Sequence, residues 1–155
     1  MRSIVLYIIL ALAVSALGQT PPVKGKQILV LLKQQRVFAL EDGEIVFNFH
    51  CSTGRKGIET PTGQTTVTAK VRWNHALAQF GGGSIPFTLR IPLYDPKMKK
   101  VRRICIHAYD SVPLHPASNG CVRLVTVSAK GLFFWAEVGI PVVVIDGPPP
   151  PKKKS

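Results

Sequence analysis

The chain has 155 residues, enough for one compact domain with a substantial core but not for two. Twenty Lys and Arg residues against eight Asp and Glu residues give a formal net charge of +12. The basic residues are not interleaved with aromatic ones, as they are in proteins that stack on single-stranded nucleic acid, so nucleic-acid binding is not predicted. The charge instead favours contact with an anionic polymer surface.

Residues 1–18 have the pattern of a signal peptide. Arg2 supplies the positive charge, residues 4–17 are apolar, and Ala16-Leu17-Gly18 is a small-x-small cleavage site. The apolar run is short for a membrane span, although an uncleaved N-terminal anchor is the alternative. In both cases the sequence predicts that the rest of the chain is exported. Residues 19–26 would then be a linker and residues 27–146 the single domain.

The first part of that domain is expected to consist of short β-strands. The candidates are residues 27–32, 36–40 and 44–50, with Glu41-Asp42-Gly43 as a tight hairpin turn between the last two. Residues 52–63 have the composition of a loop. Residues 64–71 alternate, with Val67, Ala69 and Val71 on one face, which predicts a fourth strand.

A flexible loop with three consecutive glycines, 81–83, precedes a further strand candidate at 87–93. A basic run then follows Asp95-Pro96, the expected position of a hairpin turn. Its members are expected to lie on solvated surface: Lys97, Lys99, Lys100, Arg102 and Arg103.

A His and a Cys flank a proline-containing loop within residues 104–124. His107 ends a β-like run, and Cys121 follows Gly120 after the loop. A Cys nucleophile needs a base nearby, because the thiolate is the reactive form. Gly120 permits a tight turn in which successive N–H groups, from Asn119 to Cys121, could converge as an oxyanion hole. A buried Cys and an unrelated loop His are the alternative interpretation.

The end of the chain contains the one convincing helix, at residues 126–138. Thr126 or Ser128 is expected to cap it and Gly139 to end it. Four of its apolar side chains are expected in the core: Leu132, Phe133, Phe134 and Trp135. Residues 141–145 are apolar on both faces, which predicts a buried closing strand. The Pro- and Lys-rich residues 147–155 are expected to form an extended tail.

The stretch around Cys121 resembles the signature of the L,D-transpeptidase family of the YkuD or ErfK type. In that signature a His and a loop precede Ser/Thr-His-Gly-Cys, an apolar residue, and Arg or Asn. The residues that match are His107, Ser118, Gly120, Cys121 and Arg123, whereas Asn119 stands where the family most often has a second His. Cys51-Ser52-Thr53-Gly54 and Glu59-Thr60-Pro61-Thr62-Gly63 resemble further family segments. The resemblance covers roughly residues 27–145 and implies a mostly β fold, a β-sandwich of mixed sheets with one short helix near the C-terminus.

The resemblance implies a cofactor-free acyl transfer on peptidoglycan stem peptides. Cys121 would attack the carbonyl of the third stem residue and release the terminal D-alanine, with His107 as the base. Passing the acyl group to an amine would form 3→3 cross-links or exchange terminal residues. The implied oxyanion donors are the N–H groups of Asn119, Gly120 and Cys121, and the implied substrate-binding residues are Ser118 and Arg123. Arg123 would pair with a carboxylate of the stem peptide or with a structural carboxylate.

The same resemblance implies cell-wall polymer as the partner, a bacterial periplasm or cell wall as the location, and carbapenem-type β-lactams as covalent inhibitors. Two other functions remain open. In the first, water replaces the acceptor amine, which gives an L,D-carboxypeptidase. In the second, the fold serves as a non-catalytic wall-binding module, an interpretation supported by Asn119 and the basic tail. Because an amide cannot accept a proton, Asn119 leaves the base role to His107, with His115 as a weaker rival. A backbone carbonyl or Asp110 would orient His107.

The three cysteines allow two arrangements in an exported protein. Cys51 and Cys105 either form a disulfide or remain two buried thiols, and both arrangements leave Cys121 as the free reactive thiol. Cys105 shares a strand face with His107 and is therefore expected near the site. A metal site built from His50, Cys51, Cys105 and His107 matches no zinc spacing, so no metal is predicted.

Overall fold

The fold is described from a computed structural model, which places residues 24–147. The expected signal peptide at 1–18 lies outside the described residues, as does all of the expected tail except Gly147. Within residues 24–147 there is no helix with the length and hydrophobicity that a membrane crossing needs.

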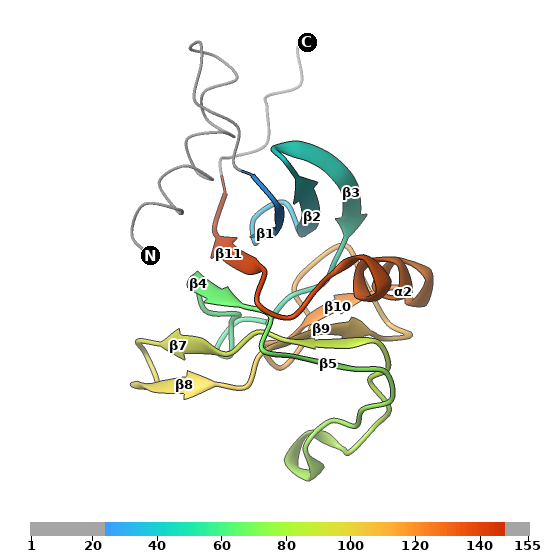
Figure 1. The fold of residues 1–155 in the computed structure, drawn as a ribbon. Coiled ribbons are helices and arrows are strands. Elements are labelled where there is room, and N and C mark those ends of the chain that lie inside the picture. The colour runs from blue at the N-terminus through green and yellow to red at the C-terminus, as the bar shows by residue number, and fades with distance from the viewer. Residues whose placement is uncertain (1–23, 148–155) are drawn as a thin grey trace, which may run out of the picture.

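A five-stranded sheet forms one layer, with the strand order β3-β2-β1-β11-β4 (Figure 1). Its central pair, β1 and β11, is parallel, and the other neighbours are antiparallel. The strands are β1 (Lys26–Leu31), β2 (Arg36–Glu41), β3 (Glu44–His50), β4 (Gly63–Thr66) and β11 (Pro141–Ile145). The first three strands, the turn at Asp42-Gly43 and the buried closing strand are therefore confirmed.

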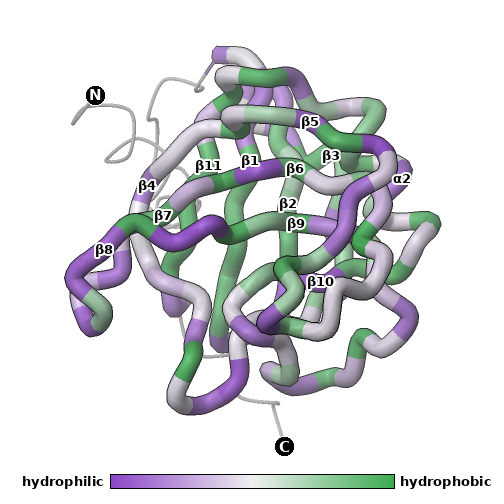
Figure 2. The backbone as a smooth tube through the Cα atoms, turned by 90° about the horizontal axis from the view of Figure 1, so that it is seen from below, coloured by the Kyte–Doolittle hydropathy of each residue, from purple (hydrophilic) through white to green (hydrophobic). Residues whose placement is uncertain are grey.

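A four-stranded sheet forms the second layer, with the order β10-β9-β6-β5. Its members are β5 (Ala69–Val71), β6 (Thr88–Arg90), β9 (Cys105–Ala108) and β10 (Val122–Leu124). Here β9 and β10 are parallel and the other pairs are antiparallel. The predicted turn after Asp95 is confirmed as the hairpin of β7 (Leu93–Asp95) and β8 (Lys100–Arg102). Figure 2 shows β5, β6 and β9 crossing over β1, β2 and β11.

The main core lies between the two sheets and the helix α2 (Thr126–Trp135). It joins Ile28 and Val30 of β1 to Leu89 of β6, Ile106 of β9 and Leu132 of α2, all of which are almost fully buried. Burying each such side chain contributes about 1.5–3 kcal/mol. The alternate residues of β1 point to the opposite face and form a second, smaller cluster: Leu29 and Leu31, with Leu40 and Val143. The described residues therefore form a mostly β fold with mixed sheets and one α-helix, as predicted.

Two expected strands are each divided between different sheets. Residues 64–71 contain β4 and β5, because Val67 donates to Ile140 O while the next residue, Thr68, donates to Arg90 O. Residues 87–93 contain β6 and the start of β7. Ile91 still donates to Ile104 O, but Pro92 has no N–H and ends the pairing.

The helix is shorter than predicted and is capped differently. It ends at Trp135, and two lysines cap its terminal carbonyls: the Lys26 Nζ donates to Trp135 O at 3.1 Å, and the Lys70 Nζ donates to Ala136 O. These lysines come from β1 and from β5, which are far away in the sequence. The N-cap is Val125, without a side-chain cap, so the prediction of Thr126 or Ser128 is wrong. Phe134 is 58% exposed and does not belong to the core, contrary to the prediction.

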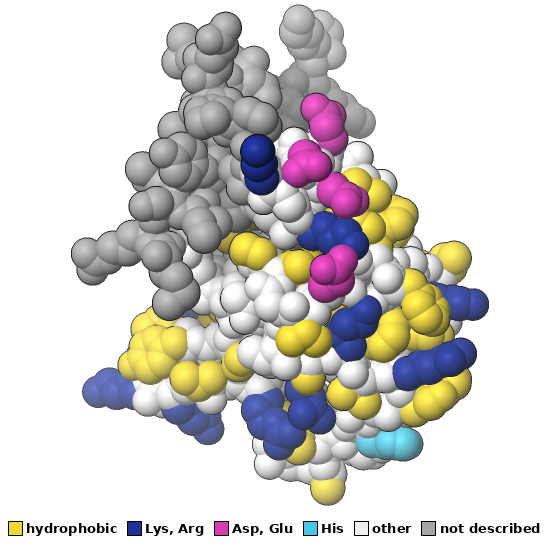
Figure 3. All heavy atoms as spheres, viewed as in Figure 1, with side chains coloured by type: hydrophobic (Ala, Val, Ile, Leu, Met, Phe, Trp, Pro, Cys, Tyr) yellow, Lys and Arg dark blue, Asp and Glu magenta, His cyan; other side chains and the backbone are white. Residues whose placement is uncertain are grey.

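The glycine-rich segment between β5 and β6 forms a hairpin-like extension. Ile85 donates to Asn74 O and Phe87 donates to Arg72 O, and a short 3-10 helix, η2 (Ala78–Phe80), lies near the tip. The surface of the described part is mainly basic. Figure 3 shows Lys and Arg side chains spread over the lower part of one face, while the Asp and Glu side chains on that face gather in its upper part.

Candidate active site

His107 and Cys121 come together because their strands are neighbours in the four-stranded sheet. The parallel strands β9 and β10 pair with His107 opposite Arg123 and Ile106 opposite Val122. Cys121 directly precedes β10, so alternation places it on the same face as Arg123 and His107. The His107 imidazole lies close enough to the Cys121 sulfur to lower the pKa of that thiol by hydrogen bonding and by its charge. The candidate base and the candidate nucleophile are thus in direct contact.

A backbone carbonyl orients His107, one of the two options left open by the sequence. The imidazole is buried, and its Nδ1 lies 2.8 Å from Ala108 O. With its proton on Nδ1, the ring donates to this carbonyl and keeps Nε2 as the basic nitrogen. Asp110 is exposed and takes no part in this contact. The rival base His115 is also exposed, with Nδ1 3.1 Å from Pro116 O.

The pKa of the Cys121 thiol lies well below its ordinary value. The largest cause is a hydrogen bond donated by the Cys105 thiol. Three smaller causes also lower the pKa: hydrogen bonding to His107, the His107 charge, and the Cys105 N–H. Burial raises the pKa, but the other causes outweigh it. Cys105 gives its proton to this bond and is itself buried, so its pKa is raised. The arrangement therefore favours ionisation of Cys121 over ionisation of Cys105. The sequence placed Cys105 near the site but did not indicate this contact.

Replacing Cys105 with alanine should raise the pKa of Cys121. A lowered pKa keeps the thiolate as the pH falls below the ordinary thiol range, so the variant should lose alkylation in that range. A hydrogen bond to a charged group contributes about 1.5–3 kcal/mol, which predicts iodoacetamide alkylation at pH 6 about tenfold or more slower than in the wild type. Above the ordinary thiol pKa the two rates should converge. Cys51→Ala is the matched control, and equal pH profiles for all three proteins would contradict this account.

The turn that carries Cys121 is closed by Ser118. The Ser118 hydroxyl donates to Cys121 O and accepts the Gly120 N–H at 3.0 Å, and the residue is buried. Ser118 therefore shapes the turn, and its expected contact with a substrate stays a prediction. The Gly120 N–H is also taken up by this bond. Among residues 24–147, the N–H groups of Asn119 and Cys121 have no hydrogen-bond partner, so both remain as donors for an oxyanion.

Asn119 is held by Arg55, which follows the Ser-Thr-Gly segment. Its Oδ1 accepts a hydrogen bond from the Arg55 Nη1, and the Arg55 backbone N–H donates to Ser118 O at 3.0 Å. The Asn119 amide therefore fixes the loop from outside. No contact between this side chain and the Cys121 sulfur contributes to the lowered pKa.

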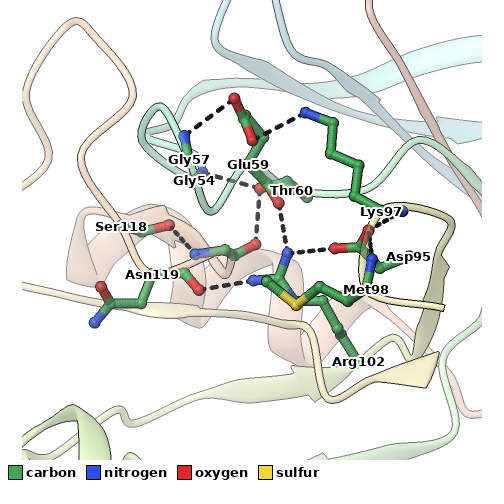
Figure 4. Close-up of polar contacts among 11 residues, drawn as sticks. Gly54, Gly57, Glu59, Thr60, Asp95, Lys97, Met98, Arg102, Ser118 and Asn119 are labelled. Carbon is green, nitrogen blue, oxygen red and sulfur yellow. Dashed lines mark hydrogen bonds and ion pairs between the residues drawn. The ribbon is translucent and has the colours of Figure 1, made fainter. Parts of the chain in front are cut away.

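Thr60, in the Thr-Pro-Thr-Gly segment, also supports the turn. Its Oγ1 donates to Gly120 O at 2.7 Å and accepts the Gly54 N–H at 2.9 Å (Figure 4). Gly54 must be a glycine here, because a Cβ would lie 2.5 Å from Ile58 O. From the sequence this segment was interpreted as a simple turn. Its only hint of a further role was the resemblance to a family segment.

Replacing Thr60 with valine should destabilise the protein without changing the side-chain volume much. Valine removes the hydroxyl and leaves the buried Gly54 N–H and Gly120 O without partners. Each unsatisfied group costs about 1–3 kcal/mol, so we expect the free energy of unfolding to fall by roughly 2 kcal/mol or more. Urea denaturation would measure it. Thr62→Val, at an exposed position of the same segment, is the control, and equal losses in the two variants would contradict the role of Thr60.

Arg102 was expected on solvated surface, but it is buried at 9% exposure. Its Nη1 lies 3.0 Å from Asp95 Oδ2, and this ion pair is buried beside the turn at Asn119-Gly120 (Figure 4). The pKa of Asp95 is lowered: burial acts against the charge, but the Met98 N–H, the Arg102 guanidinium and the Lys97 N–H outweigh it. No sequence signal separated this arginine from the lysines around it.

Arg123 lies on the same face as Cys121, as its spacing indicated. Its guanidinium stacks over the Tyr109 ring, 4.1 Å from the ring centre. Within residues 24–147 it pairs with no carboxylate, so the structural ion pair that the sequence left open is not found. The guanidinium keeps its five donors for a ligand.

The remaining cysteine chemistry is simple. All three cysteines are free, so Cys51 and Cys105 are two buried thiols and not a disulfide. Burial raises the pKa of Cys51 to about 12. No group of His, Cys, Asp or Glu side chains in the described part of the chain is arranged to hold a metal ion.

Comparison with known proteins gives the family. The model of the L,D-transpeptidase catalytic domain (YkuD) matches residues 25–144. The chain belongs to the L,D-transpeptidase family. A search of curated proteins finds no match.

Solved L,D-transpeptidases share this fold. One in complex with imipenem is 17% identical, with a TM-score of 0.66, over 78% of this chain and 59% of its own. L,D-transpeptidase 3 from Mycobacterium tuberculosis, solved with a faropenem-derived adduct, is 20% identical, with a TM-score of 0.65, over 77% and 60%. The enzyme from Xylanimonas cellulosilytica is 25% identical, with a TM-score of 0.60, over 86% and 68%. The chain thus spans less than two thirds of the first two L,D-transpeptidases.

Proposed function

We propose that this member of the L,D-transpeptidase family carries out acyl transfer on peptidoglycan stem peptides, with Cys121 as the nucleophile, outside the cytoplasm. The observation that carries the proposal is the contact between the Cys121 sulfur and the buried His107 imidazole on neighbouring parallel strands. A thiolate at neutral pH, beside a base with a fixed orientation, is what nucleophilic attack on a peptide carbonyl requires.

In the first half of the reaction Cys121 passes its thiol proton to His107 Nε2, and the resulting thiolate adds to the carbonyl of the third stem residue. The C–S bond forms, and the carbonyl oxygen becomes an oxyanion that the Cys121 N–H faces. The tetrahedral intermediate then expels the amine of the terminal D-alanine, to which His107 gives a proton. In the second half His107 takes a proton from the incoming amine, which attacks the thioester and releases Cys121.

The basic surface and Arg123 supply substrate recognition in this proposal. The stem peptide carries carboxylates, and a guanidinium can bind one of them through two parallel hydrogen bonds. Arg123 is held in place by stacking on Tyr109 and lies on the Cys121 face of the sheet. The net charge of +12 also suits an anionic wall polymer.

Inhibition by carbapenem and penem β-lactams is part of the same proposal. Two structural neighbours were solved with imipenem or with a faropenem-derived adduct. A β-lactam carbonyl presents Cys121 with the same attack and the same oxyanion as the stem peptide. We therefore expect imipenem to acylate Cys121.

A synthetic tetrapeptide stem ending in D-alanine tests the reaction. With a second stem as acceptor, we expect D-alanine to be released and a 3→3 dimer to appear in the mass spectrum. Release of D-alanine with tripeptide as the only product would assign L,D-carboxypeptidase activity instead. Binding to purified sacculi without any D-alanine release would leave a wall-binding module and overturn the enzymatic proposal.

A further inference from the structure

The Arg102 guanidinium connects three segments that are far apart in the sequence. Its Nη1 donates to Asp95 Oδ2 at 3.0 Å and to Glu59 O at 2.7 Å, and its Nη2 donates to Asn119 O at 2.9 Å. Figure 4 shows the guanidinium between the Glu59-Thr60 backbone, Asp95 and the Asn119-Gly120 turn. All of these partners except Asp95 are backbone carbonyls, so the contact fixes the course of the chain.

Asp95 cannot shift to follow the arginine. Its other oxygen, Oδ1, accepts the N–H groups of Lys97 at 2.9 Å and Met98 at 3.1 Å. The carboxylate is therefore fixed in the β7–β8 hairpin, and the guanidinium is fixed by it. A buried ion pair is weak evidence for stability, because desolvation offsets the attraction of the charges. Because the Arg102–Asp95 pair lies beside the turn that carries Cys121, we consider a role in positioning that turn.

The contact between Arg102 and Asn119 O determines the orientation of the peptide groups in the turn that precedes Cys121. In a planar trans peptide the C=O and the following N–H point in opposite directions. Arg102 holds Asn119 O, and Thr60 holds the next carbonyl, Gly120 O, at 2.7 Å. Two successive peptide planes are thus fixed, and the second of them carries the Cys121 N–H.

Gly120 makes this close approach possible. It has φ +116°, and a Cβ at this position would lie 2.1 Å from Arg102 Nη2. The guanidinium therefore packs directly against the backbone that precedes the nucleophile. Any side chain would push it away from Asn119 O.

We propose that Arg102, anchored by Asp95, is a positioning residue for acyl transfer: it fixes the Asn119-Gly120 peptide so that the Cys121 N–H faces the oxyanion. This inference rests on the proposed function, because it assumes attack of Cys121 on a carbonyl. Arg102 itself touches neither the sulfur nor the base in this account. Its removal should spare the thiolate and impair only reactions that pass through an oxyanion.

Two reagents separate these effects. Iodoacetamide reacts with the thiolate by displacing iodide at a saturated carbon, which creates no oxyanion, whereas imipenem must pass through one. Two variants are compared with the wild type: Arg102→Lys keeps the charge but not the planar fork, and Asp95→Asn/Arg102→Gln removes both buried charges together. Thermal unfolding gives a temperature at which all the proteins are folded.

We expect both variants to be acylated by imipenem about 10- to 100-fold more slowly than the wild type, since loss of one oxyanion donor costs about 10²–10³-fold and here the donor is only displaced. Their alkylation rates should stay within about twofold of the wild type. Lys97→Ala is the matched control: it removes an exposed ion pair with Glu59 from the same hairpin, and both of its rates should be unchanged.

A parallel fall of acylation and alkylation, or unchanged acylation, would overturn the role of Arg102. Absence of an imipenem adduct in the wild type would instead count against the proposed function itself. Failure of the Arg102 proposal would therefore be seen in the variants, and failure of the proposed function would be seen in the wild type.

Discussion

Replacing Cys121 with alanine should abolish both the imipenem adduct and D-alanine release. The reaction needs a thiolate, and neither of the other cysteines is placed to supply one: Cys51 is fully buried with its pKa raised to about 12, and Cys105 is also buried, which by itself raises its pKa. We expect a loss of roughly 10⁴-fold or more, down to the background. Intact-protein mass spectrometry would show one adduct per wild-type chain and none on the variant.

Two further variants sharpen this result. Cys121→Ser keeps the shape of the side chain, but an alcohol remains protonated beside His107 at neutral pH, so it should be nearly as inactive as alanine. Cys51→Ala removes a thiol from the core of the protein and should keep the adduct. If Cys121→Ala still formed the imipenem adduct, the assignment of Cys121 as the nucleophile would be wrong.

Replacing His107 with glutamine should separate the two tasks of this residue. At pH 7 the thiolate loses its charged partner, so alkylation by iodoacetamide should slow, and D-alanine release should fall by about 10²–10⁴-fold. At pH 9 hydroxide can form the thiolate, so alkylation should approach the wild-type rate. D-alanine release should stay low, because the leaving amine still lacks its proton donor.

His115→Gln is the matched control for this experiment. His115 is exposed and its ring nitrogen contacts only its own loop, at Pro116 O, so both activities should be unchanged. If high pH restored D-alanine release in His107→Gln as fully as alkylation, His107 would serve only to ionise the thiol. If His115→Gln lost activity and His107→Gln kept it, the base would be wrongly assigned.

The proximity of His107 and Cys121 could be predicted from the sequence because both lie within one local stretch. A loop and a glycine turn join the two neighbouring parallel strands on which they are placed. The strands before Cys51 were predictable for a similar reason, since alternation and the Asp42-Gly43 turn are local signals.

The support of the turn could not be predicted, because it depends on segments that meet only in the folded chain. Nothing local distinguishes Arg102 from Lys100 two residues earlier, yet Arg102 is buried and Lys100 is exposed. The division of the expected strand at residues 64–71 into β4 and β5 also depends on contacts that form only in the folded chain. Hydrophobic alternation continues through Val67, and it does not reveal that the chain changes its partner strand there. The capping of the helix C-terminus likewise comes from distant residues, the Lys26 and Lys70 ammonium groups.

The parallel pairing of β1 with β11 has a consequence for how the chain acquires its structure. β11 lies between β1 and β4, so β4 cannot join the five-stranded sheet until residues 141–145 have been made. The hydrophobic interior between the sheets therefore stays open until this strand is in place, however early the other strands have formed.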